Sequence, residues 1–392
     1  MQFGDEKKTT SIAKAAMAIL MLLSATFAGL TGCSSTSGSS TPKTTHAIVV
    51  ADASNNRVLF YSTPFSTGES ATAVLGQAGF TTSGAALSAS GTNTPVATAE
   101  DSAGNIYVAD NLNNRVLQFK APITSGESAT VAIGQLNFTS GTANLTQNGL
   151  SGPGGMAFDS SGNLWVVDFS NNRVLEYEPP FATDMNASLV IGQPNFTTGT
   201  AAVTSSGLDS PEFLTFDGSG NLWVSDLFNN RVLEFKPPFS NGMTASVVIG
   251  QADFVSSGAA TTASGLTFPT GVVFDSSGNL WIGDTGNSRV LQFQPPFSNG
   301  MSASLVLGQA NFTSSTSATT QDGFSGAFGL TFDTSGNLWV ADNGNSRTLE
   351  FTPPFSTSQN ATLVLGQANF TSSTAAATAS GQNSPTAVTA AF

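Results

Sequence analysis

The sequence predicts an all-β fold, a six-bladed β-propeller made of four-stranded antiparallel blades. Three observations support this fold. One unit recurs six times at a fixed spacing, each unit contains four strand-like runs, and the end of the chain supplies a strand that the first unit lacks. A unit repeated at such a fixed period is typical of solenoids, propellers and arrays.

The repeated unit is 58 residues long. In each copy an aspartate is followed five residues later by an arginine, and a Gly-Gln pair comes later with an aromatic residue three positions beyond the glutamine. The Gly-Gln pairs run in phase from Gln77 to Gln367, and the aromatic residues run from Phe80 to Phe370. The six pairs are Asp52 and Arg57, Asp110 and Arg115, Asp168 and Arg173, Asp226 and Arg231, Asp284 and Arg289, and Asp342 and Arg347.

Four short apolar runs lie between turn signals in each unit. One unit contains PEFLTFD from Pro211, NLWVSD from Asn221, RVLEF from Arg231 and ASVVIGQ from Ala245. Gly-Ser-Gly-Asn and Asn-Asn separate these runs and favour tight hairpin turns. The second and fourth runs are apolar on both faces, which indicates a sheet covered on both sides. Since no helical pattern is available, neighbouring sheets must provide the cover, as in a propeller.

The two ends of the chain predict a closed ring. The first copy begins at its second run, HAIVVAD from His46, and the polar segment before it cannot form a buried strand. The missing first run is PTAVTAAF, residues 385–392, which lies two periods after the equivalent Pro269 run. We therefore expect the C-terminal strand to complete the first blade, whereas an open solenoid would need polar capping repeats at both ends.

Composition excludes several classes of chemistry. The chain has 392 residues, with 12 basic and 25 acidic side chains, one cysteine and one histidine. A single cysteine excludes a disulfide framework and multi-cysteine metal sites, and a single histidine excludes zinc centres that need two or three imidazoles. The net charge of −13 argues against a nucleic-acid partner, because such binding needs clustered Lys and Arg.

The first 45 residues are expected to direct export and anchoring. Three lysines precede an apolar run of sixteen residues, Ala15–Leu30, which suits the core of a signal peptide. The run ends in Leu-Thr-Gly-Cys33, which resembles a bacterial lipobox; ordinary secretory cleavage is the alternative. The resemblance implies that residues 1–32 are removed, that Cys33 carries a lipid, and that residues 33–45 form a flexible tether. It also implies a location at the bacterial cell envelope, on the outer membrane or cell surface if the source is Gram-negative.

The unit GNLWVADxxNNRVLEF resembles the NHL repeat, a family of six-bladed propellers, and the match recurs through residues 46–392. The unit is longer than the family's usual one, and the surplus falls between each Gly-Gln pair and the next first strand. The resemblance implies that ligands bind on the face that carries the Asp-x-x-Asn-x-Arg turns and these long loops.

The repeated polar and aromatic residues are expected to be structural. Each Asp and Arg face one another across a hairpin turn, where a charge-assisted hydrogen bond can hold the turn; a ring of anion-binding arginines is the alternative. The repeated glutamines have the same interpretation. Trp165, Trp223, Trp281 and Trp339 fall inside doubly buried strands and are expected in the core, where they cannot stack on sugars.

Function is sought where the copies differ. The two residues after each aspartate include Leu112, Phe169, Leu227 and Phe228, in turns expected to be exposed. A contiguous apolar patch there suggests a binding site, unless the long loops fold over these side chains.

Two carboxylates outside the repeat pattern are candidates for a metal site. Asp209 and Glu212 flank the start of one first strand, near the channel mouth. Oxygen ligands suit hard cations, but the equivalent residues of the other units add no further carboxylate. His46, at the end of the tether, is expected to be solvated.

Two functions are therefore considered. The favoured one is a lipid-anchored binding scaffold, a monomer without a cofactor, whose turn-bearing face binds a protein or a glycan. The alternative is a metal-dependent hydrolase or lyase of the lactonase-like kind, opposed by the absence of a histidine cluster and by the incomplete acidic set. Fold alone does not decide between them.

Overall fold

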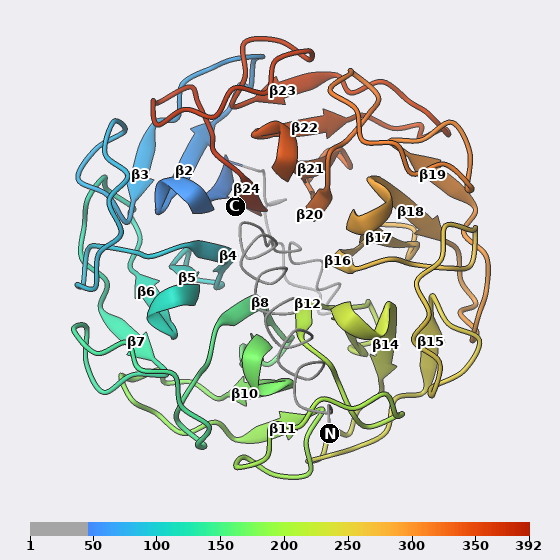
Figure 1. The fold of residues 1–392 in the computed structure, drawn as a ribbon. Coiled ribbons are helices and arrows are strands. Elements are labelled where there is room, and N and C mark those ends of the chain that lie inside the picture. The colour runs from blue at the N-terminus through green and yellow to red at the C-terminus, as the bar shows by residue number, and fades with distance from the viewer. Residues whose placement is uncertain (1–45) are drawn as a thin grey trace, which may run out of the picture.

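Six four-stranded antiparallel sheets are arranged around a central axis in the computed structural model, which describes residues 46–392 (Figure 1). The sheets are the blades of the predicted propeller. From the axis outward, blade 1 contains β24 (Pro385–Ala391), β1 (Ala47–Asp52), β2 (Arg57–Ser62) and β3 (Ala73–Leu75). Blade 2 contains β4 (Pro95–Glu100), β5 (Ile106–Asp110), β6 (Arg115–Phe119) and β7 (Val131–Ile133). Blade 3 contains β8 (Pro153–Phe158), β9 (Leu164–Asp168), β10 (Arg173–Tyr177) and β11 (Leu189–Ile191).

The other three blades repeat this order. Blade 4 contains β12 (Pro211–Phe216), β13 (Leu222–Asp226), β14 (Arg231–Phe235) and β15 (Val247–Ile249). Blade 5 contains β16 (Pro269–Phe274), β17 (Leu280–Asp284), β18 (Arg289–Phe293) and β19 (Leu305–Leu307). Blade 6 contains β20 (Ala327–Phe332), β21 (Leu338–Asp342), β22 (Arg347–Phe351) and β23 (Leu363–Leu365). Within residues 46–392 no helix is long and apolar enough to cross a bilayer.

The ring closes through the C-terminal strand, as the sequence predicts. β24 pairs antiparallel with β1, with Val388 opposite Val50 and Ala391 opposite Ala47. The first and last strands thus share one sheet (Figure 1). The prediction of six closed blades is confirmed.

One short 3-10 turn joins the second and third strands of every blade. Its last helical residue is followed by an Asn or Ser in the left-handed conformation, such as Asn230 at φ 52°, a conformation that Asn tolerates well. The turns are η1 (Ala53–Asn55), η2 (Asn111–Asn113), η3 (Phe169–Asn171), η4 (Leu227–Asn229), η5 (Thr285–Asn287) and η6 (Asn343–Asn345).

The disc has two distinct faces. The 3-10 turns and the long loops between blades share one face, which we call the turn face, because the strands of a blade alternate in direction. The opposite face carries the turns between first and second strands and the Pro-Pro-Phe segments. Since Asp52 lies opposite Arg57 at the turn end of blade 1 and Ala47 lies opposite Ser62 at the other end, the described chain begins on the opposite face.

Aromatic side chains join neighbouring blades. Each tryptophan of a second strand is buried, and its ring meets phenylalanines of the following blade edge to face. Trp165, Trp223 and Trp281 each meet two, whereas Trp339 meets one, Phe65. Trp223, for example, has ring centroids 5.6 Å from Phe274 and 5.0 Å from Phe297, the phenylalanine of a Pro-Pro-Phe segment. Such pairs stabilise beyond the area that they bury. The expectation that the tryptophans belong to the core agrees with their complete burial.

Each outermost strand is covered along its free edge by the next blade. In blade 4 the amide of Val248 donates to Asn299 Oδ1 at 3.0 Å, and its carbonyl accepts from the Gly300 amide at 3.2 Å. Exposed strand edges can pair with other chains. The segment between third and fourth strands therefore protects the preceding blade as well as joining its own strands.

Candidate functional site

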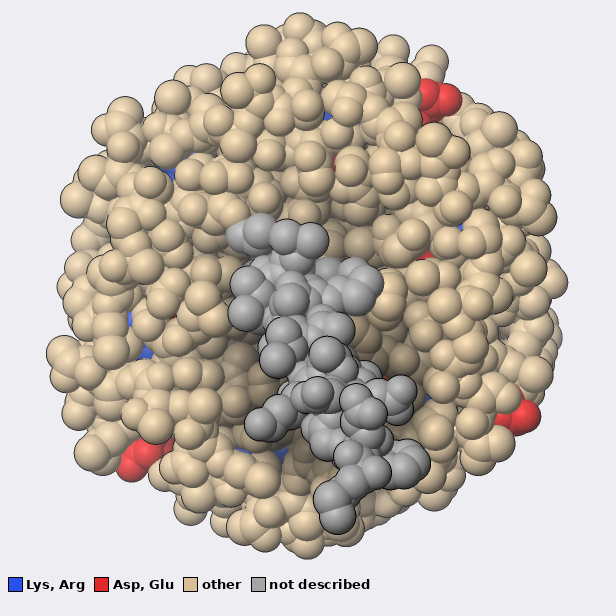
Figure 2. Space-filling model, in the orientation of Figure 1, with Lys and Arg blue, Asp and Glu red and all other residues tan. Residues whose placement is uncertain are grey.

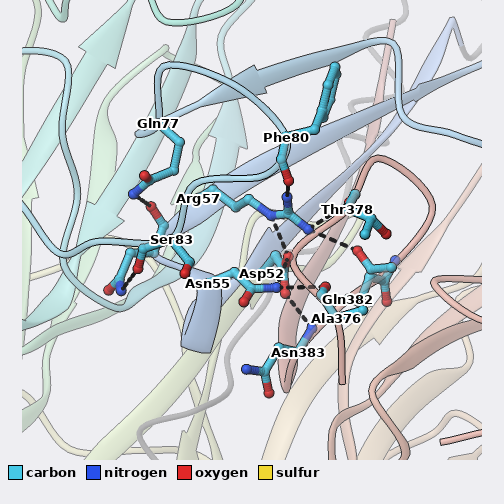
Figure 3. Close-up of polar contacts among 12 residues, drawn as sticks. Asp52, Asn55, Arg57, Gln77, Phe80, Ser83, Ala376, Thr378, Gln382 and Asn383 are labelled. Carbon is cyan, nitrogen blue, oxygen red and sulfur yellow. Dashed lines mark hydrogen bonds and ion pairs between the residues drawn. The ribbon is translucent and has the colours of Figure 1, made fainter. Parts of the chain in front are cut away.

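The six Asp and Arg pairs meet in the interior of the turn face. In blade 1, Arg57 Nε donates to Asp52 Oδ2 at 2.6 Å, and both side chains are fully buried (Figure 3). Arg57 Nη1 donates to the Phe80 carbonyl, and Nη2 donates to the Thr378 and Gly381 carbonyls, both at 2.9 Å. Phe80 follows the blade, whereas Thr378 and Gly381 precede its first strand. The arginine thus fastens the loops on both sides of the blade.

The aspartate carboxylates also accept several hydrogen bonds. Asp52 Oδ2 also accepts from Asn55 Nδ2 at 2.8 Å, and Oδ1 accepts from the Asn383 amide at 2.6 Å (Figure 3). Burial raises the pKa of Asp110, Asp226 and Asp284 to about 6, although the neighbouring arginine opposes the rise. All six arginines bond in this way and are fully buried. The arginines therefore have a structural role, and their buried guanidinium groups are not accessible to an anion.

The repeated Gly-Gln pair holds the loop that follows each blade. Gln135 Nε2 donates to the carbonyls of Asn114 and Thr142, both at 2.9 Å. Gly134 before it has φ +91°, and a Cβ there would lie 2.6 Å from Leu150 Cδ1. Glycine is therefore required at this position. Hydrogen bonding and sterics explain the motif without a ligand.

The first residue of each 3-10 turn packs against the following blade. Thr285 Oγ1 donates to the Ala327 carbonyl at 2.7 Å, and Asn111 Nδ2 donates to the Pro153 carbonyl at 3.1 Å. Phe169 and Leu227 occupy this same position in blades 3 and 4, where they are 5% and 1% exposed. The expectation that they are exposed is thus corrected: the turn directs its first side chain inward, so both belong to the core.

The second residue of each turn is the one that reaches the surface. Leu112 is 48% exposed in blade 2, and Phe228 is partly exposed in blade 4. The same position of blade 3, between them, is Ser170, which is exposed and polar. Leu112 and Phe228 therefore do not form the contiguous apolar patch that the sequence suggested.

The two candidate metal-ligating carboxylates differ in environment. Asp209 is partly exposed just before β12; its amide donates to Asp226 Oδ1 at 2.6 Å and its carbonyl accepts from the Phe228 amide at 3.2 Å. Glu212, the second residue of β12, is 4% exposed. No described residue donates a hydrogen bond to its carboxyl group, and burial alone raises its pKa well above the usual range.

The donor set does not fit a metal centre of the lactonase-like kind. Within the part of the chain that the structure describes, no three His, Cys, Asp or Glu side chains gather. His46 is exposed beside β1, on the opposite face from Asp209. A cage of several oxygen ligands is therefore not assembled by these residues.

Sequence reasoning missed Phe268. This residue precedes β16 and lies on Phe228, with ring centroids 5.8 Å apart at an interplanar angle of 89°. Its φ of +51° is in the left-handed region, which is a genuine outlier for a bulky side chain. Phe268 could have been found from the repeat, because the equivalent residues elsewhere are small: Thr94, Gly152, Ser210, Gly326 and Ser384.

The turn face carries little charge. Figure 2 shows this face with few charged atoms, the acidic ones mainly toward the rim. Lys120 and Lys236 follow the third strands of their blades and so lie toward the opposite face. Beyond the buried arginines, the described residues therefore place no basic side chain on the turn face. The predicted signal peptide, the lipidated Cys33 and the tether of residues 33–45 lie outside the described residues.

Comparison with known proteins supports the repeat and the fold. The NHL repeat family matches residues 150–177 and 266–293, in blades 3 and 5. No curated protein matches the chain. A Bacteroides caccae protein of unknown function is 9% identical with a TM-score of 0.53, covering 87% of this chain and 97% of that one. A chain of a nidogen/laminin complex is 14% identical with a TM-score of 0.50, covering 88% and 98%.

A virginiamycin B lyase from Staphylococcus aureus is also similar, at 11% identity and a TM-score of 0.43, covering 79% of this chain and 83% of that one. At such identities the likeness concerns the fold alone.

Proposed function

We propose that this chain is a lipid-anchored β-propeller of the bacterial cell envelope that presents its turn face to a protein or glycan partner. Cys33 would hold the lipid, and residues 34–45 would be the tether. The single observation that carries the proposal is the position of the two described chain ends. His46 donates its amide to the Ala391 carbonyl at 2.8 Å, so both ends lie on the opposite face.

The tether length supports this orientation. Twelve residues, 34–45, lie between Cys33 and His46, which corresponds to a root-mean-square span of about 20 Å for a flexible chain and at most about 45 Å when fully extended. A short tether attached to the opposite face favours an orientation in which that face lies toward the membrane. The turn face, where the blades differ from one another, then points away from the bilayer and is available to a partner.

The repeat chemistry also favours binding over catalysis. The arginines, aspartates, glutamines and tryptophans that recur in the blades are committed to internal contacts. What varies on the turn face is a small set of apolar and acidic side chains. The metal-dependent hydrolase or lyase would rest on Asp209 and Glu212 alone, and no further described residue joins them.

Site-specific photo-crosslinking in whole cells tests the proposal. A photoreactive residue at Ser170 would sample the turn face, and one at Ser277 would sample the opposite face; both positions are exposed. We expect a discrete crosslinked partner from position 170 that is absent from position 277. Crosslinks from 277 alone would contradict the assignment of the turn face. Loss of palmitate labelling in Cys33→Ala tests the anchor separately.

A further inference from the structure

A groove on the opposite face lies between blades 5 and 6. Its volume is about 810 Å³, within the range of roughly 300–1,000 Å³ that is typical of small-molecule sites. The turns 275–279 and 333–336, the ends of β18 and β19, and the Pro-Pro-Phe segment of blade 6 form its walls. We call it the blade 5/6 groove.

The third strand of blade 5 departs from the repeat at this groove, where Gln292 and Gln294 line it. The corresponding pairs in the other blades are Phe60 and Ser62, Gln118 and Lys120, Glu176 and Glu178, Glu234 and Lys236, and Glu350 and Thr352. Blade 5 is thus the one blade with an uncharged amide side chain at both positions. Such amides donate and accept hydrogen bonds without adding charge.

In blade 3 the glutamate at the first of these positions is used within the blade. Asn163 Nδ2 donates to Glu176 Oε1 at 3.1 Å, and Ser188 Oγ donates to Glu176 Oε2 at 2.9 Å. Both carboxylate oxygens therefore accept bonds from the blade itself.

In blade 5 the glutamine replaces one of these acceptors with a donor. Ser304 Oγ donates to Gln292 Oε1 at 2.9 Å, so Nε2 takes the place of the glutamate oxygen that meets the asparagine. Asn279 Nδ2 donates to Asp275 Oδ2 at 2.8 Å, and an amide nitrogen carries two hydrogens. The groove therefore presents two neighbouring amide donors where blade 3 has an internal hydrogen bond.

Blade 2 also has a glutamine at this position, but its nitrogen is used within the blade. Gln118 Nε2 donates to Tyr107 OH at 2.5 Å. The residue of blade 5 that corresponds to Tyr107 is Trp281, whose Nε1 donates to Asp275 Oδ2 at 2.9 Å and whose side chain has no acceptor. Trp281 lies opposite Gln292 in the sheet, so β17 supplies no side-chain acceptor to the glutamine.

The charge of the groove favours a neutral ligand. Asp275 Oδ1 accepts from the amides of Ser277 and Asn279 at 2.9 Å and 3.0 Å, and Asp333 is bonded within its own turn in the same way. These carboxylates are committed to the turns, but their charge still repels an anion. None of the described residues that line the groove is a lysine or an arginine.

Apolar surface lies beside the amides. Pro353, Pro354 and Phe355 form the wall that blade 6 contributes. The Phe355 ring is partly exposed and is fixed against Trp281, with ring centroids 4.9 Å apart. A sugar ring matches such a site because it has apolar C–H faces and a rim of hydroxyl groups, each of which both donates and accepts hydrogen bonds.

We propose that the blade 5/6 groove binds a neutral oligosaccharide. A sugar hydroxyl oxygen accepts from Gln292 Nε2 and Asn279 Nδ2, the exposed Gln294 amide bonds a further hydroxyl, and the C–H face of the ring packs on Phe355. This site lies on the other face from the partner surface proposed above and does not depend on it.

Saturation-transfer NMR on the full chain tests the site. The chain is held in a zwitterionic detergent, because the head groups of alkyl glycosides would compete. The probes are cellotetraose, maltotetraose, mannotetraose and chitotetraose, and the matched anionic control is cellotetraose oxidised to a carboxylate at every C6.

Three variants locate the binding. Gln292→Glu removes the amide donor and restores the residue of blades 3 and 4, and Gln294→Lys introduces the residue that blade 4 has as Lys236. Thr352→Lys, the control, places the same lysine at the corresponding position of blade 6. All three should retain the wild-type melting temperature, because neighbouring blades fold with these side chains.

We expect at least one neutral tetrasaccharide to bind saturably and the carboxylated one not to bind. Loss of a neutral hydrogen bond has a modest effect, so Gln292→Glu and Gln294→Lys should each weaken binding by about threefold to tenfold, whereas Thr352→Lys should leave it unchanged. Saturation of no neutral probe, equal binding of the carboxylated probe, or equal weakening by Thr352→Lys would overturn the proposal.

The same spectra separate two sources of the sugar. Transfer to the internal rings of the tetrasaccharide indicates a polysaccharide, and transfer to the terminal non-reducing ring alone indicates a glycolipid head group. Ser277 lines the groove, so a protein crosslinked from position 277 that no tetrasaccharide displaces would identify a protein site and overturn the oligosaccharide proposal. Saturable tetrasaccharide binding without a crosslink from position 170 would contradict the partner surface on the turn face and leave the groove assignment standing.

Discussion

At the residue scale, buried charge divides into two kinds with opposite consequences. In the six Asp and Arg pairs every guanidinium nitrogen donates a hydrogen bond, and these bonds hold the loops in place, as those of Arg57 do in Figure 3. Glu212 is also buried, at 4% exposed against 0% for the pairs, but no described residue donates a hydrogen bond to its carboxyl group. The pairs serve the fold, whereas Glu212 imposes a cost that folding alone does not explain.

Removal of one paired arginine should strongly destabilise the folded protein. Arg231→Ala leaves Asp226 buried and uncompensated and also releases the carbonyls of Thr204, Gly207 and Phe254. Breaking a buried ion pair on one side costs about 3–5 kcal/mol, which urea unfolding would measure. The control Lys236→Ala removes an exposed lysine and should change the unfolding free energy by less than about 0.5 kcal/mol. A small effect of Arg231→Ala would show that the pair contributes little.

Glu212 should make stability depend on pH. Burial raises its folded pKa above the usual 4.5, so folding favours the protonated form. The part of the unfolding free energy that comes from this pKa shift is fully present below the usual pKa and is lost as the pH rises through the folded pKa. Glu212→Gln should therefore unfold at a higher urea concentration than wild type at pH 8, and the difference should shrink at pH 5. An unchanged pH dependence would contradict the burial of an unpaired carboxyl, and Glu178→Gln serves as the exposed control.

The sequence predicted these sites unevenly. The repeated Asp and Arg were predicted to be structural, because a residue present in all six blades is expected to support the blade fold that all six share. The differences between copies led to the prediction that Phe169 and Leu227 are exposed, which is wrong because a 3-10 turn directs its first side chain toward the next blade. Phe268 was missed although the small residues at the equivalent positions mark it as a departure from the repeat; only the backbone shows that the position is left-handed.

At the element scale, each blade depends on the one that follows. Tryptophans of second strands are enclosed by phenylalanines of the next blade, and outermost strands are covered by the next blade's connecting segment. The four strand runs of each unit were predictable from alternating apolar and turn residues. The edge cover was not, because its bonds join backbone groups and polar side chains that carry no apolar pattern.

The Pro-Pro-Phe segments should be major determinants of blade contact. Phe297 packs against both Trp223 and Phe274, with centroids 5.0 Å and 6.0 Å away. Phe297→Ala should cost about 3 kcal/mol, the lower end for loss of a large aromatic ring, because Phe297 is only partly buried. Guanidinium unfolding measures the cost, with the exposed Val255→Ala as the control expected to be near neutral. An equal effect of both substitutions would argue against an interlocking role.

At the scale of the whole molecule, ring closure by β24 fixes both the stability of the disc and its orientation. Deletion of residues 385–392 would remove the innermost strand of blade 1 and expose the edge of β1. We expect the truncated chain to lose cooperative unfolding and to be cleaved first within blade 1 in limited proteolysis. Native-like cooperativity after this deletion would show that the ring does not need its closing strand.

Closure was predictable because the same 58-residue period places residues 385–392 in phase with the other first strands. The orientation of the disc relative to the membrane was not predictable, because it depends on which face of the disc the tether joins.

The central claim is that the anchor lies on one face and the binding surface on the other. Energy transfer from a dye on a single engineered cysteine to an acceptor lipid tests it, with the lipidated full chain in vesicles and Cys33 already modified. Ser277→Cys places the dye on the opposite face and Ser170→Cys on the turn face. Stronger transfer from position 277 than from position 170 is the predicted result. Stronger transfer from position 170 would place the turn face against the membrane and contradict the account.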